Sequence, residues 1–183
     1  MVKRFLVTTA IEETWPKDGP VLFLGEWCRL YNRKSVWEKM DAEIAPYHWD
    51  DRVKFRKDYQ YIKDLHETLL EELTEKLNKL HRVEHSLRYW RILLGPWLGQ
   101  FTQILYDRWF MLKYATREYQ IRKCRISATE PSSNIPNDYK QFDEQCSGDW
   151  WNEAIYGQLI KRFFQDTIEI EEIKIAKIPK QNT

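Results

Sequence analysis

The segment from 85 to 112 constrains the fold more than any other part of the chain, because long apolar side chains recur along it at helical spacing. The predicted buried face consists of Trp90, Leu93, Leu94, Trp97, Phe101, Ile104, Leu105, Trp109 and Leu112. Ser86 is suited to cap this helix, and Gly95-Pro96 predicts a kink or a division into two helices, because proline lacks an N–H donor. The polar residues within the segment argue against a membrane span: Arg88, Arg91, Gln100, Gln103, Asp107 and Arg108. We therefore predict a central buried helix or helix pair.

The preceding segment predicts the partner of this helix. From Phe55 to Leu80 the apolar residues keep a nearly helical spacing, and the opposite face is strongly charged. The same pattern would suit a coiled coil, but it spans only about three heptads. An antiparallel helical hairpin over residues 51–118 is the more economical interpretation.

Short apolar runs near the N-terminus predict a small parallel sheet. They cover residues 5–9, 21–25 and 42–46, and the second run is continuous, which is typical of a strand buried on both faces. A weak alternation at 120–126 predicts an edge strand, and residues 150–164 predict a helix that Asp149 caps. Strands followed by helices indicate the α/β class, here with a high helix content.

We accordingly expect one α/β domain over residues 1–183. It would contain a strand-rich part (1–50), the helical hairpin (51–118), an edge strand with helices (119–165) and a tail (166–183).

Composition excludes some classes of protein. The net charge of +1 argues against a nucleic-acid binder, which normally carries a basic excess. Aromatic residues make up 15% of the chain, and we interpret them as core residues rather than as a stacking surface. The three cysteines, Cys28, Cys124 and Cys146, are widely separated and form no CxxC pair, which suits a reducing compartment. The apolar run at the N-terminus is too short for a signal peptide, so we expect a cytoplasmic protein.

The sequence contains no P-loop, no GxGxxG and no GxSxG motif. His81 and His85 lie at a predicted helix boundary, so we expect no metal site. Candidate site residues are therefore assigned by position, because ligands of open α/β sheets bind outside the carboxyl ends of the strands.

Polar and aromatic residues follow each of the three predicted N-terminal strands. They are Thr8, Thr9, Glu12 and Glu13 after the first, Gly25, Glu26 and Trp27 after the second, and Tyr47, His48, Trp49 and Asp50 after the third. A histidine or carboxylate at this edge could accept the proton of an attacking hydroxyl group. The predicted catalytic residues are His48, Asp50, Glu12 and Glu13.

The remaining positions predict substrate contacts. Trp27 and Trp49 could stack on a sugar ring, with Glu26 beside them, although core packing is an equal alternative for both tryptophans. For Asp50 the alternative role is that of a helix cap. Arg88 and Arg91 could bind an anion near a helix N-terminus, or they could pair with the acidic helix face from 67 to 75.

Several stretches together resemble the N-terminal region of a family of transferases found in gene clusters for bacterial surface carbohydrates such as O-antigen and lipopolysaccharide. The stretches are FLVTTAIEETWP, VLFLGEWCRLY, PYHWDDR, HSLRYWRILLGPWLGQF and DWWNEAIYGQLI. The resemblance covers roughly residues 4–165 and implies a GT-B-like architecture with a separate donor-binding domain. It implies candidate status for Glu12, Glu13, Glu26, His48, Asp50, Arg88 and Arg91 at the matching positions.

The resemblance implies that this chain is the acceptor-side domain of a sugar or phosphosugar transferase, without the C-terminal donor-binding domain. The expected partners are a glycan or lipid-linked acceptor and a donor domain that holds the nucleotide sugar. No cofactor is expected in this chain, and peripheral contact with the inner membrane is compatible with such an acceptor. The alternative is a non-catalytic interaction module, or a fragment without activity of its own.

Overall fold

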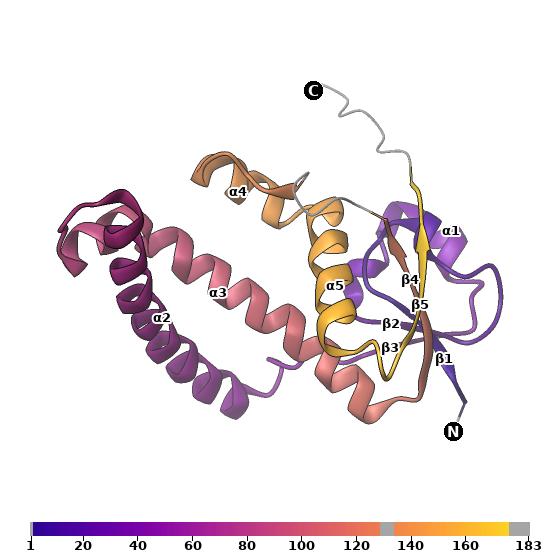
Figure 1. Cartoon of the computed structure of the whole chain (residues 1–183). Coiled ribbons are helices and arrows are strands. Elements are labelled where there is room, and N and C mark those ends of the chain that lie inside the picture. The colour runs from indigo at the N-terminus through magenta and orange to yellow at the C-terminus, as the bar shows by residue number, and fades with distance from the viewer. Residues whose placement is uncertain (1, 129–133, 176–183) are drawn as a thin grey trace. The chain divides into compact units, whose positions relative to one another are not determined.

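The computed structural model describes residues 2–128 and 134–175 (Figure 1). Contacts between Cα atoms group the chain into two compact units. The sheet unit comprises Met1–Pro46 and Met111–Thr183, and the hairpin unit comprises Tyr47–Phe110.

The sheet unit is built on a five-stranded sheet in the order β3-β2-β1-β4-β5. Its strands are β1 (Arg4–Val7), β2 (Val21–Phe23), β3 (Ala42–Ile44), β4 (Ile121–Ser127) and β5 (Glu169–Ile173). Each neighbouring pair is parallel, which confirms the predicted α/β class with a short parallel sheet.

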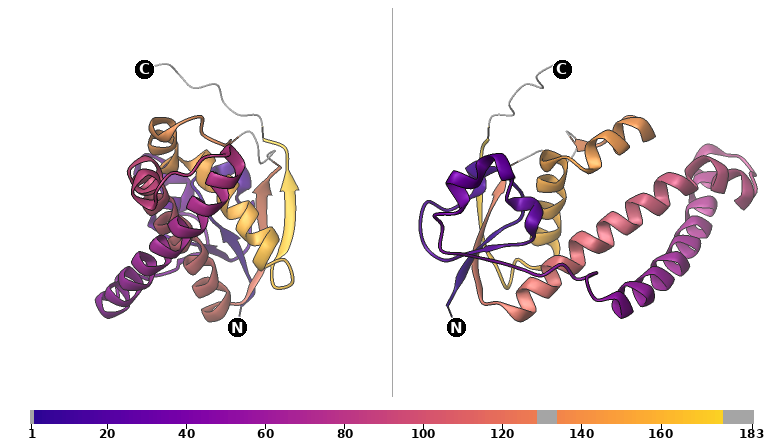
Figure 2. Two further views of the ribbon diagram at one scale, coloured as in Figure 1. Left: turned by 60° about the vertical axis from the view of Figure 1, so that its left-hand side comes forward. Right: turned by 180° about the vertical axis from the view of Figure 1, so that it is seen from behind.

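The core of the sheet unit follows from its apolar runs. Leu6 pairs in register with Leu22 on one side and with Cys124 on the other, and all three side chains are buried. Helix α5 (Asp149–Phe163) lies along one face of the sheet, while α1 (Lys34–Trp37) lies on the other side (Figure 2). Gly157 of α5 packs closely on β4, because a Cβ atom there would lie 3.7 Å from the Ile126 side chain.

Two predictions for the C-terminal part are wrong. The segment 120–126 is not an edge strand, because β4 pairs with both β1 and β5. The predicted tail contains β5, a strand of isoleucines and glutamates in which no side chain is fully buried. Lys123 on β4 pairs with Glu169 and Glu171 across this edge, at 3.3 and 2.9 Å. Residues 176–183 of the predicted tail lie outside the described residues.

Short turns and helices connect the strands. The connection from β1 to β2 contains η1 (Glu12–Thr14). The connection from β2 to β3 contains η2 (Glu26–Cys28), η3 (Tyr31–Arg33) and α1. Helices α4 (Tyr139–Cys146) and α5 precede β5. The predicted helix over 150–164 is confirmed, but its N-cap is Gly148, so Asp149 is the first residue of the helix and not the cap.

The hairpin unit contains α2 (Arg52–His81) and most of α3 (Leu87–Glu118), as predicted. Arg82 ends α2 in the left-handed conformation, with φ of 56°. The Asn78 side chain then fastens the turn, since its Oδ1 accepts hydrogen bonds from the His85 N–H at 3.1 Å and the Trp90 indole at 2.9 Å. The predicted cap Ser86 is confirmed, because its hydroxyl oxygen accepts the Tyr89 N–H at 3.3 Å.

Burial along α3 differs from the prediction. The helix runs through Pro96 without dividing into two helices. Only Trp90 and Leu112 of the predicted face are fully buried, and Leu93 is 58% exposed. A helix in a two-helix hairpin has one neighbour, so it buries one narrow stripe and leaves its other apolar positions partly open.

Candidate functional site

The strand order reverses between β1 and β4 in the sheet unit. From β1 the chain proceeds through β2 to β3 on one side, and β4 and β5 lie on the other. In open α/β sheets this switch point, outside the carboxyl ends of the strands, is where ligands bind. Thr8 and Thr9 follow β1 there, and Ser127 is the last residue of β4.

Helix α5 supplies a carboxylate to this switch point. Glu153 is 1% exposed, and its Oε2 accepts hydrogen bonds from the Thr9 hydroxyl at 2.8 Å and the Thr8 hydroxyl at 3.4 Å. Its Oε1 accepts the Ser127 N–H at 3.0 Å. Glu153 therefore links the ends of β1 and β4.

A second carboxylate precedes Glu153 by one helical turn on the same face of α5. Asp149 accepts the Ala10 N–H at 3.2 Å through Oδ1. Asn152 fixes the start of the helix, because its amide donates to the carbonyl oxygens of Cys146 and Gly148. Two acidic groups are thereby held at the carboxyl end of β1.

No cation in the described part of the chain neutralises either carboxylate. Among residues 2–128 and 134–175, no lysine or arginine forms an ion pair with Asp149 or Glu153. Burial raises the pKa of both carboxyl groups, and for Glu153 the Thr9 hydroxyl and the Ser127 N–H partly oppose this effect. A carboxylate with a raised pKa is a better proton acceptor near neutral pH than an ordinary one.

Gly25 and Trp27 shape the neighbouring end of β2. The Trp27 ring lies over Gly25 so closely that a Cβ atom there would be 2.1 Å from the ring. The Trp27 indole donates to the Thr8 carbonyl at 3.0 Å, so the ring is fixed beside the switch point. Cys28 is buried in this region, and burial raises the pKa of its thiol to about 12, so it remains protonated and a poor nucleophile.

The predicted acidic residues of the sheet unit occupy different environments. Glu12 pairs with Arg33 through both carboxylate oxygens, and this guanidinium lowers the pKa of Glu12. Glu26 pairs with Arg29 at 2.6 Å, and Glu13 is exposed. No hydrogen bond or ion pair within the described part of the chain joins these three to Asp149 or Glu153.

His48 belongs to the hairpin unit, where it is 5% exposed. Its Nε2 lies 3.0 Å from Asp107 Oδ1 and its Nδ1 lies 2.9 Å from Lys54 Nζ. Because ammonium can only donate, Nδ1 accepts and Nε2 donates. Both ring nitrogens therefore have protein partners.

Trp49 and Asp58 extend the same network. The Trp49 indole donates to Asp58 at 2.9 Å, and Lys54 also pairs with Asp58. The Trp49 ring stacks on Tyr106 with an interplanar angle of 14°. Asp50 is exposed and does not cap α2, whereas Asp51 does, since it accepts the N–H groups of residues 53 and 54.

Arg91 was a candidate for anion binding, with pairing to the acidic face of α2 as the alternative. The structure agrees with the alternative. The Arg91 guanidinium binds both oxygens of Glu67, each at 2.6 Å, and this pairing lowers the pKa of Glu67 to about 2. Arg88 is exposed.

The hairpin unit also contains a groove of about 610 Å³ between α2 and α3. Its lining is Trp49, Phe55, Tyr59, Ile62, Lys63, His66, Arg91, Gly95, Pro96, Gly99, Gln100 and Gln103. The part of α3 that lines the groove includes Gly95, Pro96 and Gly99. Because these residues have small side chains or none, they leave the groove unfilled. Aromatic walls with a few polar groups are typical of small-molecule sites.

Glu153 is the functional candidate that sequence reasoning missed. The signal was the DWWNE stretch, which places two acids four residues apart at the start of a helix. An acidic residue in the first turn is common for electrostatic reasons alone, so the signal becomes informative only when the strand order is known.

A search of curated proteins and a search of solved structures each find no match to the chain. A family model described as "LIC12162 family transferase" matches residues 4–183. The match covers nearly the whole chain, including the switch-point threonines and both acids of α5. The chain therefore belongs to the LIC12162 family of transferases.

Proposed function

We propose that this chain is the acceptor-binding part of a transferase that attaches a sugar or phosphosugar to a hydroxyl group during surface-carbohydrate synthesis. Family membership supports a transferase. The sugar class is inferred from the resemblance to proteins of surface-carbohydrate gene clusters. In this proposal a GT-B-like donor domain would supply the activated sugar.

The observation that carries the proposal is the pair of uncompensated carboxylates at the switch point. Asp149 is half-buried and uses Oδ1 for the Ala10 N–H, which leaves Oδ2 for an acceptor hydroxyl. Glu153 has both oxygens engaged and is buried, so we assign it to positioning. Asp149 would accept the hydroxyl proton as the acceptor oxygen attacks the donor, and the nucleotide or phosphate would leave.

The test is a transfer assay in which the chain is combined with a donor domain and given a panel of nucleotide sugars with glycan and lipid-linked acceptors. The readout is release of the nucleotide together with the mass of the product. Asp149→Asn should lower the rate by about 10²- to 10⁴-fold, since that is the usual contribution of a general base. Asp166→Asn, at an exposed position just beyond α5, is the matched control and should leave the rate unchanged. A wild-type rate in Asp149→Asn, or no transfer with any donor when the donor domain is supplied, would refute the proposal.

The same assay tests the prediction that His48 is the base. Replacement of His48 by Ala should abolish transfer without loss of folded protein if the imidazole acts on substrate. Its hydrogen-bonded partners on both ring nitrogens, Asp107 and Lys54, instead favour a structural role. In that case His48→Ala would lower the yield of folded protein, and the protein that folds would keep its rate.

A further inference from the structure

Helix α3 presents an exposed apolar stripe on its N-terminal half. Tyr89, Ile92 and Leu93 recur at the spacing of one helix face and are 43%, 72% and 58% exposed. Trp90 and Leu98 on the same helix are 6% and 4% exposed. This part of α3 is therefore apolar both towards its neighbour and away from it, whereas a helix on a water-facing surface normally carries polar residues outward.

The segment that forms the turn of the hairpin and the start of α3 carries an excess of basic residues. Between Lys76 and Leu93 the chain has five lysine and arginine residues and a single glutamate, although the whole chain has a net charge of only +1. Arg91 is neutralised by Glu67, and Lys76 lies near Glu72. In the described part of the chain, Lys79, Arg82 and Arg88 form no ion pair.

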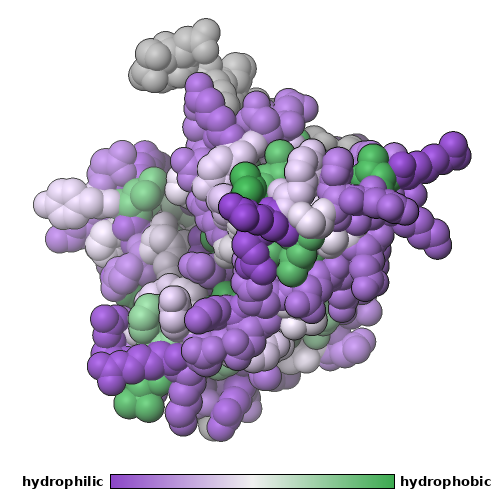
Figure 3. All heavy atoms as spheres, turned by 90° about the vertical axis from the view of Figure 1, so that its left-hand side faces the viewer, coloured by the Kyte–Doolittle hydropathy of each residue, from purple (hydrophilic) through white to green (hydrophobic). Residues whose placement is uncertain are grey.

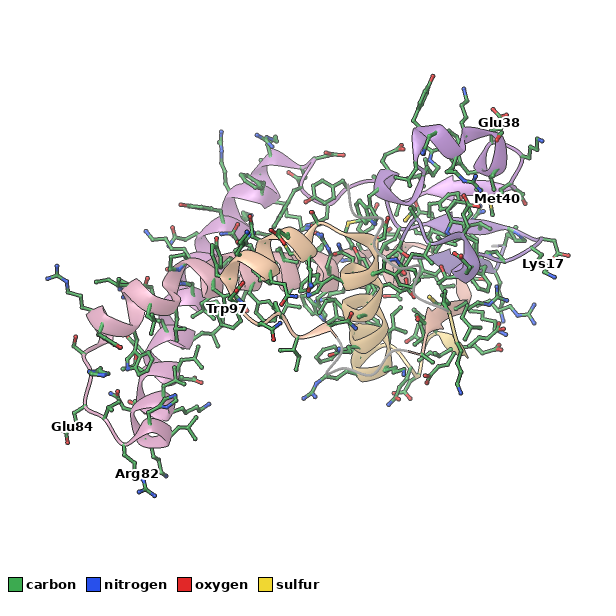
Figure 4. The ribbon with its side chains drawn as sticks, turned by 90° about the horizontal axis from the view of Figure 1, so that it is seen from above. Lys17, Glu38, Met40, Arg82, Glu84 and Trp97 are labelled. Carbon is green, nitrogen blue, oxygen red and sulfur yellow. The ribbon has the colours of Figure 1, made fainter. Side chains whose placement is uncertain are left out.

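The basic side chains are also accessible. Lys79, Arg82 and Arg88 are all exposed. Figure 4 shows Arg82 pointing away from the turn between α2 and α3. Figure 3, which looks onto the side where this turn lies, shows hydrophobic residues set among strongly hydrophilic ones.

We propose that this end of the hairpin rests on an anionic lipid bilayer. Ile92 and Leu93 would enter the boundary between head groups and acyl chains, and Tyr89 would lie at head-group depth. Lys79, Arg82 and Arg88 would contact the anionic head groups. No helix among the described residues is long and apolar enough to cross a membrane, so the hairpin would lie on the surface. The charge favours a bilayer over a second copy of the chain, because two copies of this end would repel each other.

Flotation of the full chain with vesicles tests the proposal. The chain should bind vesicles that contain phosphatidylglycerol at least about tenfold more tightly than vesicles of pure phosphatidylcholine, and salt should weaken the binding. The double variant Ile92→Gln/Leu93→Gln should lose at least about tenfold in affinity. Val53→Gln is the matched control, because Val53 is 63% exposed but lies at the other end of α2.

A second variant separates charge from apolar contact. Lys79→Gln/Arg88→Gln should lose the preference for phosphatidylglycerol. Both positions are exposed, and circular dichroism checks that the variant is folded. Absence of vesicle binding, or unchanged binding in both double variants, would overturn the proposal. So would sedimentation that shows a wild-type dimer dissociated by Ile92→Gln/Leu93→Gln, since the stripe would then be a contact between copies.

Discussion

Asp107 in the hairpin unit and Glu153 in the sheet unit are buried to a similar degree, 3% and 1% exposed, but their surroundings differ. Asp107 has a charged neighbour in Arg108 and a hydrogen-bonded imidazole in His48. Among the described residues, the partners of Glu153 are two hydroxyl groups and a backbone N–H. A buried carboxylate that has a counterion can be explained by its role in the fold. A buried carboxylate without a counterion destabilises the fold and therefore indicates a functional site.

The direction of the pKa shifts expresses the same difference. Burial raises the pKa of Asp107, but the His48 hydrogen bond and the Arg108 charge outweigh it, and the pKa is lowered overall. Asp58 in the same network also has a lowered pKa, since Lys54 and the indole of Trp49 oppose its desolvation. In the sheet unit burial dominates, and the pKa values of Asp149 and Glu153 are raised.

The largest expected effect comes from removing the hairpin acid. Asp107→Ala should lower the free energy of unfolding by about 3–5 kcal/mol, because it leaves the buried partners of a charge network unpaired. Urea titration with circular dichroism at neutral pH measures this loss. Glu72→Ala is the control on the exposed face of α2, where the Lys76 contact is 3.7 Å, and it should cost less than about 1 kcal/mol.

The matching substitution in the sheet unit should cost far less. In Glu153→Gln the amide oxygen can accept the Ser127 N–H, and the amide N–H can donate to the Thr9 hydroxyl, which rotates to accept it. An uncompensated buried charge is removed and its hydrogen bonds are kept. Equal losses in Glu153→Gln and in the equivalent amide change Asp107→Asn would contradict the distinction between the two clusters.

A smaller effect is expected at the threonines that hold Glu153. Thr9→Val removes a bond of 2.8 Å to a carboxylate and should cost about 1–3 kcal/mol, while valine preserves the branched shape. Thr8→Val removes a contact of 3.4 Å and should cost less. The same urea titrations rank the two variants. A larger loss in Thr8→Val would mean that Thr8, and not Thr9, is the main hydroxyl partner of Glu153.

The sheet and the hairpin were predictable where burial is nearly complete. Residues 21–24 are all fully buried, and their continuous apolar run correctly indicated a central strand. Strand β4 was misassigned because its buried Cys124 and Ile126 alternate with arginine and lysine, which resembles an edge strand. Local periodicity reports the burial of each side chain and does not report which strands lie on either side.

The candidate site was predictable only in part, for a related reason. Thr8 and Thr9 were identified because they follow an obvious strand. Glu153 could not be identified, because its role depends on strand order, which places α5 at the boundary between β1 and β4. The predicted Glu12 and Glu26 pair with arginines. The partner of Glu12 is Arg33, 21 residues away, so the local sequence of Glu12 gives no sign of the pairing.

The smallest expected effect has the opposite sign, and it concerns Asp149. Because its folded-state pKa is raised, the folded chain binds a proton more tightly than the unfolded chain, so this residue makes stability fall as pH rises from about 4 through the folded-state pKa. Asp149→Asn keeps an acceptor for the Ala10 N–H and lacks this penalty. The variant should match the wild type at low pH and become the more stable protein towards neutral pH. The hairpin acids, with lowered pKa values, make stability fall as pH drops, so they cannot produce this difference.

The free energy of unfolding of the wild type and of Asp149→Asn, measured across this pH range, tests whether the Asp149 carboxylate stabilises or destabilises the fold. A variant less stable than the wild type at neutral pH would show that the Asp149 carboxylate serves the fold. A variant that is more stable yet inactive in transfer would show the reverse, because a charge that weakens the fold is retained only where its chemistry is used.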